Sequence, residues 1–195
     1  MNMPVRNILK SEKGYATIMF LIMLPLIFLF MIASLDHTRS VLGTDLDMQQ
    51  ALNDACRSAA MMVNPLSQAY NDPMVNPDKA HEAFRVILAS NLNLNDDLTP
   101  RENSSVTDVE YLLIVFNGEN SYEIPAGKAY SETNPAGTEF SGTLPYIFTE
   151  AELGVEVSIE LNRPGCVAVA NAKLKPIIGK QKSTGVRWSS AKILR

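Results

Sequence analysis

The feature that most constrains this chain is one uncharged apolar run near its N-terminus, from Tyr15 to Leu35. A helix that crosses the hydrocarbon core of a bilayer needs roughly 20 predominantly apolar residues. The run therefore predicts a transmembrane helix over 15–35. A cleaved secretory signal is the alternative, but its apolar core normally has only about 7–15 residues before a small-residue cleavage site. Because this run is longer and ends in a weak cleavage site, we expect it to be retained.

Charge is segregated along the chain, and it predicts an orientation. The N-terminal flank carries Arg6, Lys10 and Lys13 against Glu12, whereas the other flank opens with Asp36. By the positive-inside rule, we expect residues 1–14 in the cytoplasm and 36–195 outside, with membrane lipid around a single-pass span. The last 33 residues are basic and free of acids but lack interleaved aromatic residues, so we do not expect nucleic-acid binding.

Helical periodicity continues beyond the apolar run. Apolar residues recur at helical spacing as far as Val63, and Asn64-Pro65 then stops the pattern, so we expect one helix over about 15–63. Residues 64–77 are rich in Pro, Asn and Asp and predict a loop. Asn76-Pro77 is typical of a capped helix start, and the helix should run over about 78–92.

The period then changes to that of strands. We expect a buried strand over 109–116, a turn at Asn117-Gly118, a return strand over 121–124 and a long exposed loop over 125–145. Further strands are predicted over 153–161, 165–170 and 185–194. The expected fold class is α+β, with a long N-terminal transmembrane helix extending into an outer amphipathic helix, then a second helix and a small antiparallel sheet. The expected divisions are a cytoplasmic leader (1–14), the transmembrane helix (15–35), its outer extension (36–63) and an extracytoplasmic α+β head (64–195).

No pattern in the sequence predicts catalysis. His37 and His81 lack partners at metal-ligand spacing, and we find no nucleophile elbow, phosphate loop or dinucleotide fingerprint. We therefore expect a protein that is not an enzyme and has no catalytic residue, cofactor, metal or evident small-molecule substrate. Cys56 and Cys166 could form a disulfide or remain two small buried thiols, and the sequence leaves both open. Pro25 should kink the helix, or else mark a segment that partly unwinds on assembly.

The junction before the apolar run resembles a known family. Ser11-Glu-Lys-Gly14 is followed by an entry that ends in Phe20, by Leu24-Pro25-Leu26 and by a polar exit at 36–39. This pattern is similar to the TadE/TadG-like pseudopilins of tight-adherence (Flp) pilus systems, and the resemblance extends over the Ala-rich stretch at 46–60. It implies a processing site at Gly14-Tyr15 cut by a prepilin peptidase. It also implies a bacterial cytoplasmic-membrane protein that works with other pilus-assembly proteins and pilin subunits.

One position departs from the family pattern. The family usually carries Glu five residues after the cut, where this chain has Met19. A carboxylate there favours assembly with a partner, because an unpaired charge in lipid is costly. The sequence therefore leaves open whether the chain enters a fibre or stays in the assembly platform. The leading hypothesis is a minor, pilin-like, membrane-anchored component of a tight-adherence type IV pilus system, which bears on cell adhesion and secretion. The alternatives are an anchored binding or sensor module unrelated to pili and, less favoured, an anchored enzyme of the cell envelope.

Overall fold

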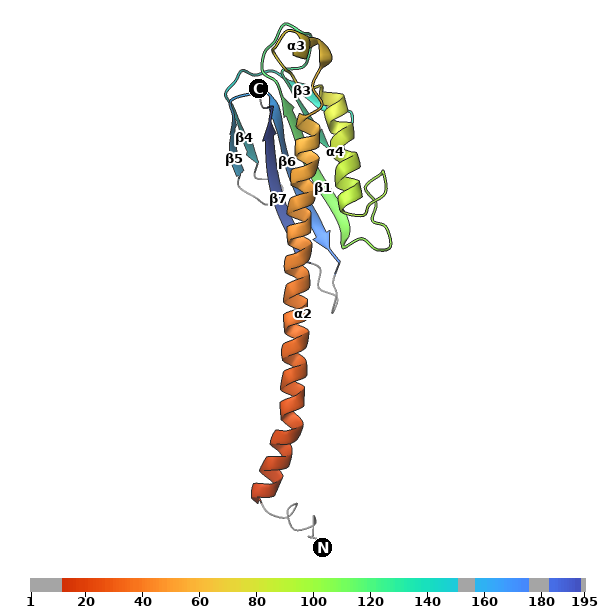
Figure 1. Ribbon diagram of the computed structural model, residues 1–195, viewed down its shortest axis with the longest axis vertical. Helices are drawn as coiled ribbons and strands as arrows, with labels where there is room; N and C mark the ends of the chain where they lie inside the picture. The colour runs from red at the N-terminus through yellow and green to blue at the C-terminus, as the bar shows by residue number, and fades with distance from the viewer. Residues whose placement is uncertain (1–11, 151–156, 176–182, 194–195) are drawn as a thin grey trace. The chain divides into compact units, whose positions relative to one another are not determined.

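The structure of the chain is a computed structural model that describes residues 12–150, 157–175 and 183–193. The chain divides into two compact units, Met1–Leu42 and Gly43–Arg195. Figure 1 labels the elements of the chain. In order, they are α2 (Glu12–Ala60), α3 (Pro65–Ala69), α4 (Pro77–Asn91), β1 (Val106–Phe116), β2 (Gly127–Ser131), β3 (Thr138–Phe140), β4 (Tyr146–Glu150), β5 (Val157–Leu161), β6 (Gly165–Leu174) and β7 (Ser183–Lys192).

The predicted transmembrane helix over 15–35 is wrong. Within the described residues, no helix combines the length and the apolar character that crossing a bilayer requires. The apolar run is only one part of α2, and the same 49-residue helix also carries polar and charged residues such as Asp47, Asp54 and Arg57. α2 is therefore long, but it is not apolar along its whole length. The single-pass anchor, the assigned orientation and the cytoplasmic-membrane localisation lose their support with it.

The predicted helix boundaries agree closely with the structure. α2 ends at Ala60, three residues before the expected end, and Pro25 lies inside it. The segment 64–77, expected to be a loop, contains the short helix α3, with Asn64 as its N-cap. Asn76 caps α4 as predicted, because its side-chain oxygen accepts a hydrogen bond from the Lys79 N–H at 3.1 Å.

The strands form two antiparallel sheets. The larger has the order β3-β2-β1-β6-β7, and β4 and β5 form a separate pair. The expected strands over 109–116, 165–170 and 185–194 are present as β1, β6 and β7 with shifted ends. The expected return strand over 121–124 is wrong, because β1 instead pairs with β2, which begins at Gly127. β2 and β3 both lie in the segment expected to be a long loop, and β4 was not predicted. Of the strand expected over 153–161, residues 157–161 are present as β5, and residues 153–156 lie outside the described part of the chain.

The two faces of the larger sheet pack against different partners. Val167 and Val169 of β6 belong to an apolar cluster with Phe148 of β4 and Leu161 of β5, so the β4–β5 pair covers one face. The alternate residues of β6 are small and fully buried, and α2 covers this other face beside α4 (Figure 1). These small residues are Cys166, Ala168, Ala170 and Ala172. On α2, the buried positions of its last turns are also mostly small, as in Ala51, Ala55, Cys56 and Ala59. Small side chains on both elements allow the helix to approach the sheet closely.

Candidate interaction surface, thiol pair and loop cleft

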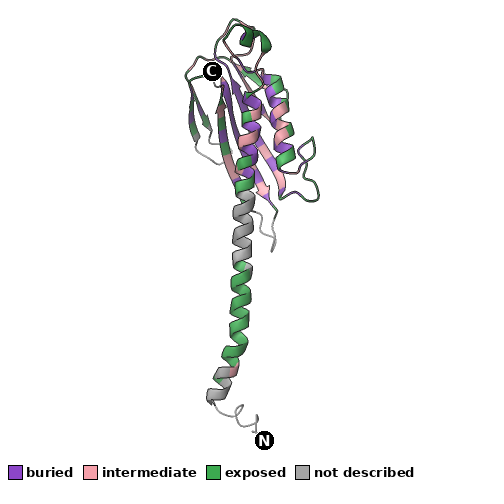
Figure 2. Ribbon diagram, viewed as in Figure 1, coloured by how far each residue is buried: buried purple, intermediate pink, exposed green. Residues whose placement is uncertain are grey.

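The N-terminal unit presents an apolar surface on α2. Thirteen large apolar side chains between Met19 and Ile32 are 41–77% exposed, and Figure 2 shows this stretch of the helix as exposed. Because they occupy nearly every position of about four helical turns, they surround the helix rather than forming one stripe. Burying one such side chain contributes about 1.5–3 kcal/mol. Among the described residues of this unit nothing covers the surface, so it is a candidate for contact with an apolar partner.

The residues that the sequence singled out around this surface lie in the same helix. Gly14 and Tyr15 fall in the first turn of α2, and Pro25 falls within the apolar stretch. Met19, at the position where the family usually has Glu, is 47% exposed. The processing site and the kink stay predictions. Residues 1–11 of the expected leader lie outside the described part of the chain, and so does the side chain of His37.

The two cysteines, far apart in sequence, meet in the core of the second unit. Both are free thiols and fully buried, and the Cys56 Sγ lies 3.5 Å from the carbonyl oxygen of Cys166, to which it donates. The Cys56 Sγ also lies 3.7 Å from the Ser189 carbonyl oxygen, so this thiol contacts both β6 and β7. Burial raises the pKa of the Cys56 thiol to about 12, and burial also raises that of Cys166. The Cys56 thiol thus joins α2 to β6 and β7, and a disulfide between the two cysteines stays one of the two alternatives that the sequence left open.

His81 of α4 is buried and belongs to a polar cluster between α4 and the sheet. Its Nε2 lies 2.8 Å from the Tyr111 hydroxyl of β1, and its ring stacks on Tyr130 of β2 with centroids 4.2 Å apart. The Tyr130 hydroxyl donates to Asp78 at 3.0 Å, and Lys128 pairs with the same carboxylate oxygen at 2.8 Å. Burial lowers the pKa of His81 to about 4, because the charged ring would lose its hydration. The cluster therefore holds α4 on the sheet with a neutral histidine.

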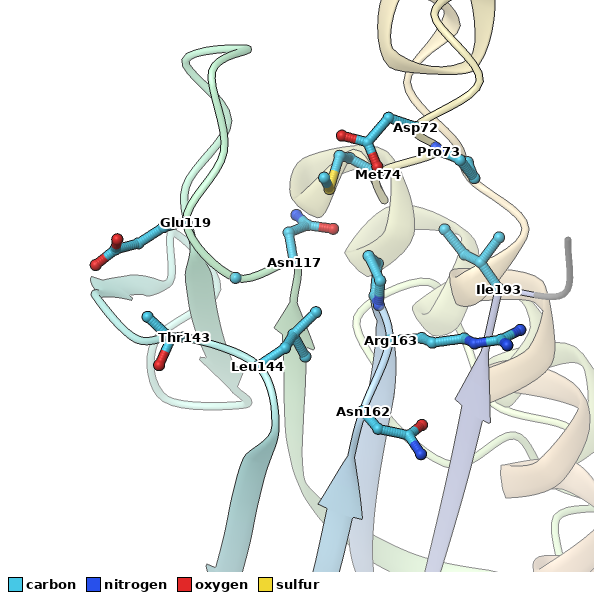
Figure 3. A pocket seen from close by; sticks show the side chains of 12 residues that line it. Asp72, Pro73, Met74, Asn117, Glu119, Thr143, Leu144, Asn162, Arg163 and Ile193 are labelled. Carbon is cyan, nitrogen blue, oxygen red and sulfur yellow. The ribbon is translucent and has the colours of Figure 1, made fainter.

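Five loop segments meet around a cleft at one end of the sheet. The cavity has a volume of about 460 Å³, and Figure 3 shows the side chains that line it. Its rim carries acidic Asp72 and Glu119 together with basic Arg163. Buried Asn117 also lines the cleft, and its side chain accepts from the Val75 N–H at 2.8 Å and donates to the Val75 carbonyl at 3.0 Å. A cleft with both charges suits a polar ligand or a turn of a partner protein.

Sequence reasoning did not anticipate the cleft or the histidine cluster. The Asn117-Gly118 turn was predicted, and Gly118 has the positive φ of 77° that such a turn uses. The hydrogen bonds of Asn117 to Val75 cross 42 residues and left no signal in the sequence. Within the described ranges, no group of three or more His, Cys, Asp or Glu side chains could hold a metal ion.

Comparisons with known proteins add no assignment. No protein-family model matches the chain, and no curated protein or solved structure shows significant similarity to it.

Proposed function

We propose that this chain is a non-enzymatic pilus-assembly protein, a minor pilin-like component of a tight-adherence (Flp) type IV pilus system. The observation that carries the proposal is the apolar surface around α2 between Met19 and Ile32. A monomer seldom keeps so large an apolar surface uncovered, because contact with a partner would remove it from water. The partners that we propose are apolar helices of other pilus-assembly proteins and pilin subunits.

The arrangement of the chain supports a structural role. The apolar stretch belongs to the first unit, and the second unit is a compact α+β body with its own core. The apolar stretch would supply attachment to neighbouring subunits, and the compact unit would supply the surface that they recognise. The junction motif at Gly14-Tyr15 supports processing by a prepilin peptidase, which would leave Tyr15 as the new N-terminal residue close to the start of α2.

Deletion and complementation in the bacterium that encodes the chain test this function. The deletion strain is complemented with the wild-type gene, with the double variant Leu21→Asp/Phe28→Asp, or with a control double variant Leu46→Asp/Val86→Asp. The four positions are matched in exposure, at 67%, 57%, 70% and 60% respectively. Pili per cell are counted by electron microscopy, and the amount of protein is followed by immunoblot.

We expect the deletion to abolish pili, and the wild type and the control variant to restore them. The variant within the apolar stretch should not restore them although its protein is present, because two carboxylates oppose burial against apolar helices. A deletion strain with normal pili would refute the proposed function. Intact mass of the purified protein tests processing separately, since a chain that keeps residues 1–14 has not been cut after Gly14.

The loop cleft favours a second candidate, a binding module unrelated to pili. Its cavity of about 460 Å³ lies within the usual range of small-ligand pockets, and charged groups of both signs line it. This candidate predicts normal pili after deletion. It also predicts that some member of a panel of small zwitterionic metabolites raises the unfolding temperature of the wild type but not of Arg163→Glu. A panel without effect on the wild type would count against it.

A further inference from the structure

One edge strand of the larger sheet, β7 (Ser183–Lys192), is long. It runs for ten residues beside β6, and no other strand of the described chain pairs with its outer side (Figure 1). The opposite edge strand, β3, has only three residues. Proteins usually shorten or cover such edges, because unpaired N–H and C=O groups can pair with another chain. A ten-residue edge of this kind is therefore a candidate interface.

The hydrogen bonds of β7 show which of its residues point outward. The Ile193 N–H donates to the carbonyl of Pro164, directly opposite in the β6–β7 register, at 3.0 Å. In an antiparallel pair, bonded residues alternate with residues whose N–H and C=O point away. The residues of β7 whose N–H and C=O groups point away from β6 are therefore Thr184, Val186, Trp188, Ser190 and Lys192.

A contact made by α2 supports this assignment independently. The Gln49 Nε2 donates to the Trp188 carbonyl at 3.1 Å, which requires that this carbonyl point away from β6. The Arg187 side chain donates to a second outward carbonyl, that of Val186, at 2.7 Å. Both bonds are accepted by carbonyl oxygens, so neither of them uses an outward N–H group of β7.

We propose that this edge binds a second copy of the chain, with the two β7 strands antiparallel and Trp188 opposite Trp188 of the second copy. A two-fold axis at this residue brings each outward donor against an outward acceptor, so the edge is complementary to itself. In this register Arg187 lies opposite Ser189, and Lys192 lies opposite Thr184. No like charges are therefore directly opposed, whereas they would destabilise a cross-strand pair.

Trp188 also supplies the apolar contact that such an interface needs. Its side chain is 45% exposed although tryptophan is large and apolar, and it sits at the centre of the outward-facing series. Buried tryptophans at the centre of an interface often dominate its binding energy. On pairing, the Trp188 N–H of the second copy replaces the Gln49 amide at the Trp188 carbonyl, and the two tryptophans remove each other from water.

Charge exchange at residue 188 tests the proposal in the full chain. The protein is studied in a non-ionic detergent that covers the apolar stretch of α2, and sedimentation velocity measures its association. We expect a dimer of the wild type. Trp188→Lys and Trp188→Glu should each weaken dimerisation at least tenfold, because like charges meet at the axis. An equimolar mixture of the two variants should dimerise again, since Lys then faces Glu. Association through α2 cannot produce this recovery.

Two further variants serve as controls. Ile147→Lys replaces an exposed apolar residue of β4, 61% exposed, and should leave the dimer intact. Ser190→Pro removes one outward N–H without removing a bond to β6, and it should weaken the dimer. Far-UV circular dichroism establishes that each variant is folded. A wild type that stays monomeric would overturn the proposal. So would a wild type that binds only a different protein through this edge. Dimers that persist in both charge variants, or a mixture that fails to recover, would overturn it as well.

Discussion

Replacing Asn117 by alanine should destabilise the second unit more than the small change in side-chain volume suggests. The Asn117 side chain is 1% exposed and satisfies both backbone groups of Val75, which is itself fully buried. The substitution leaves a buried N–H and a buried C=O without this partner. Each group left unsatisfied costs about 1–3 kcal/mol, so we expect a loss of about 3 kcal/mol in the free energy of unfolding.

Urea denaturation followed by the fluorescence of Trp188, the single tryptophan of the chain, measures this loss. Asn134→Ala is the matched control, because Asn134 makes its side-chain bond to Thr138 at an exposed position and should cost less than about 0.5 kcal/mol. Asn117→Asp separates hydrogen bonding from volume, since a carboxylate can accept from the Val75 N–H but repels the Val75 carbonyl. If Asn117→Ala costs no more than Asn134→Ala, the reasoning is refuted.

Three further predictions follow from the core of the second unit. The pKa of His81 is about 4 in the folded state, below its ordinary value of 6.5, so the unfolded state binds the proton more readily. The free energy of unfolding should therefore fall as the pH drops from about 6.5 to 4, by about 2 kcal/mol at pH 5. His81→Gln should flatten this pH profile, which urea titrations at each pH would measure. Ala168→Leu should cost about 1–3 kcal/mol by forcing α2 off the sheet, which thermal unfolding against Val167→Leu would measure. Cys56 and Cys166 should resist alkylation in the folded protein and both react once it is denatured without reductant, as mass spectrometry can count; a pair that never reacts would instead be disulfide-bonded.

Local patterns were enough to predict much of the secondary structure. Asn76 and Pro77 predicted the start of α4 because an N-cap and a proline at the first helical position act within one turn. The apolar run and the periodicity after it predicted most of α2, and the β-branched and aromatic residues before Asn117 predicted β1. In each case the determining interactions are between near neighbours in sequence.

The prediction of which strand pairs with β1 was wrong, because strand pairing depends on residues far apart in sequence. The return strand was placed directly after the Asn117-Gly118 turn, whereas β1 pairs with β2 from Gly127 onward. Glycine fits at position 127, whereas any larger residue would place a side chain against Phe140 and Phe116. Which of several weak strand segments pairs with β1 is decided by such contacts, and they form only when the sheet is assembled.

The sequence by itself determined the ends of α2 and α4 to within three residues, that strands follow them, and that one part of α2 is apolar all around, but it did not reveal α3. The tertiary structure decided which residues meet. It brings Cys56 to Cys166, Asn117 to Val75, and His81 to two tyrosines from different strands. It also decided which residues of β7 point outward, because that depends on the phase of its pairing with β6. Helix signals depend on residues three or four apart, whereas these contacts join residues 30 to 110 positions apart and exist only once the core has packed.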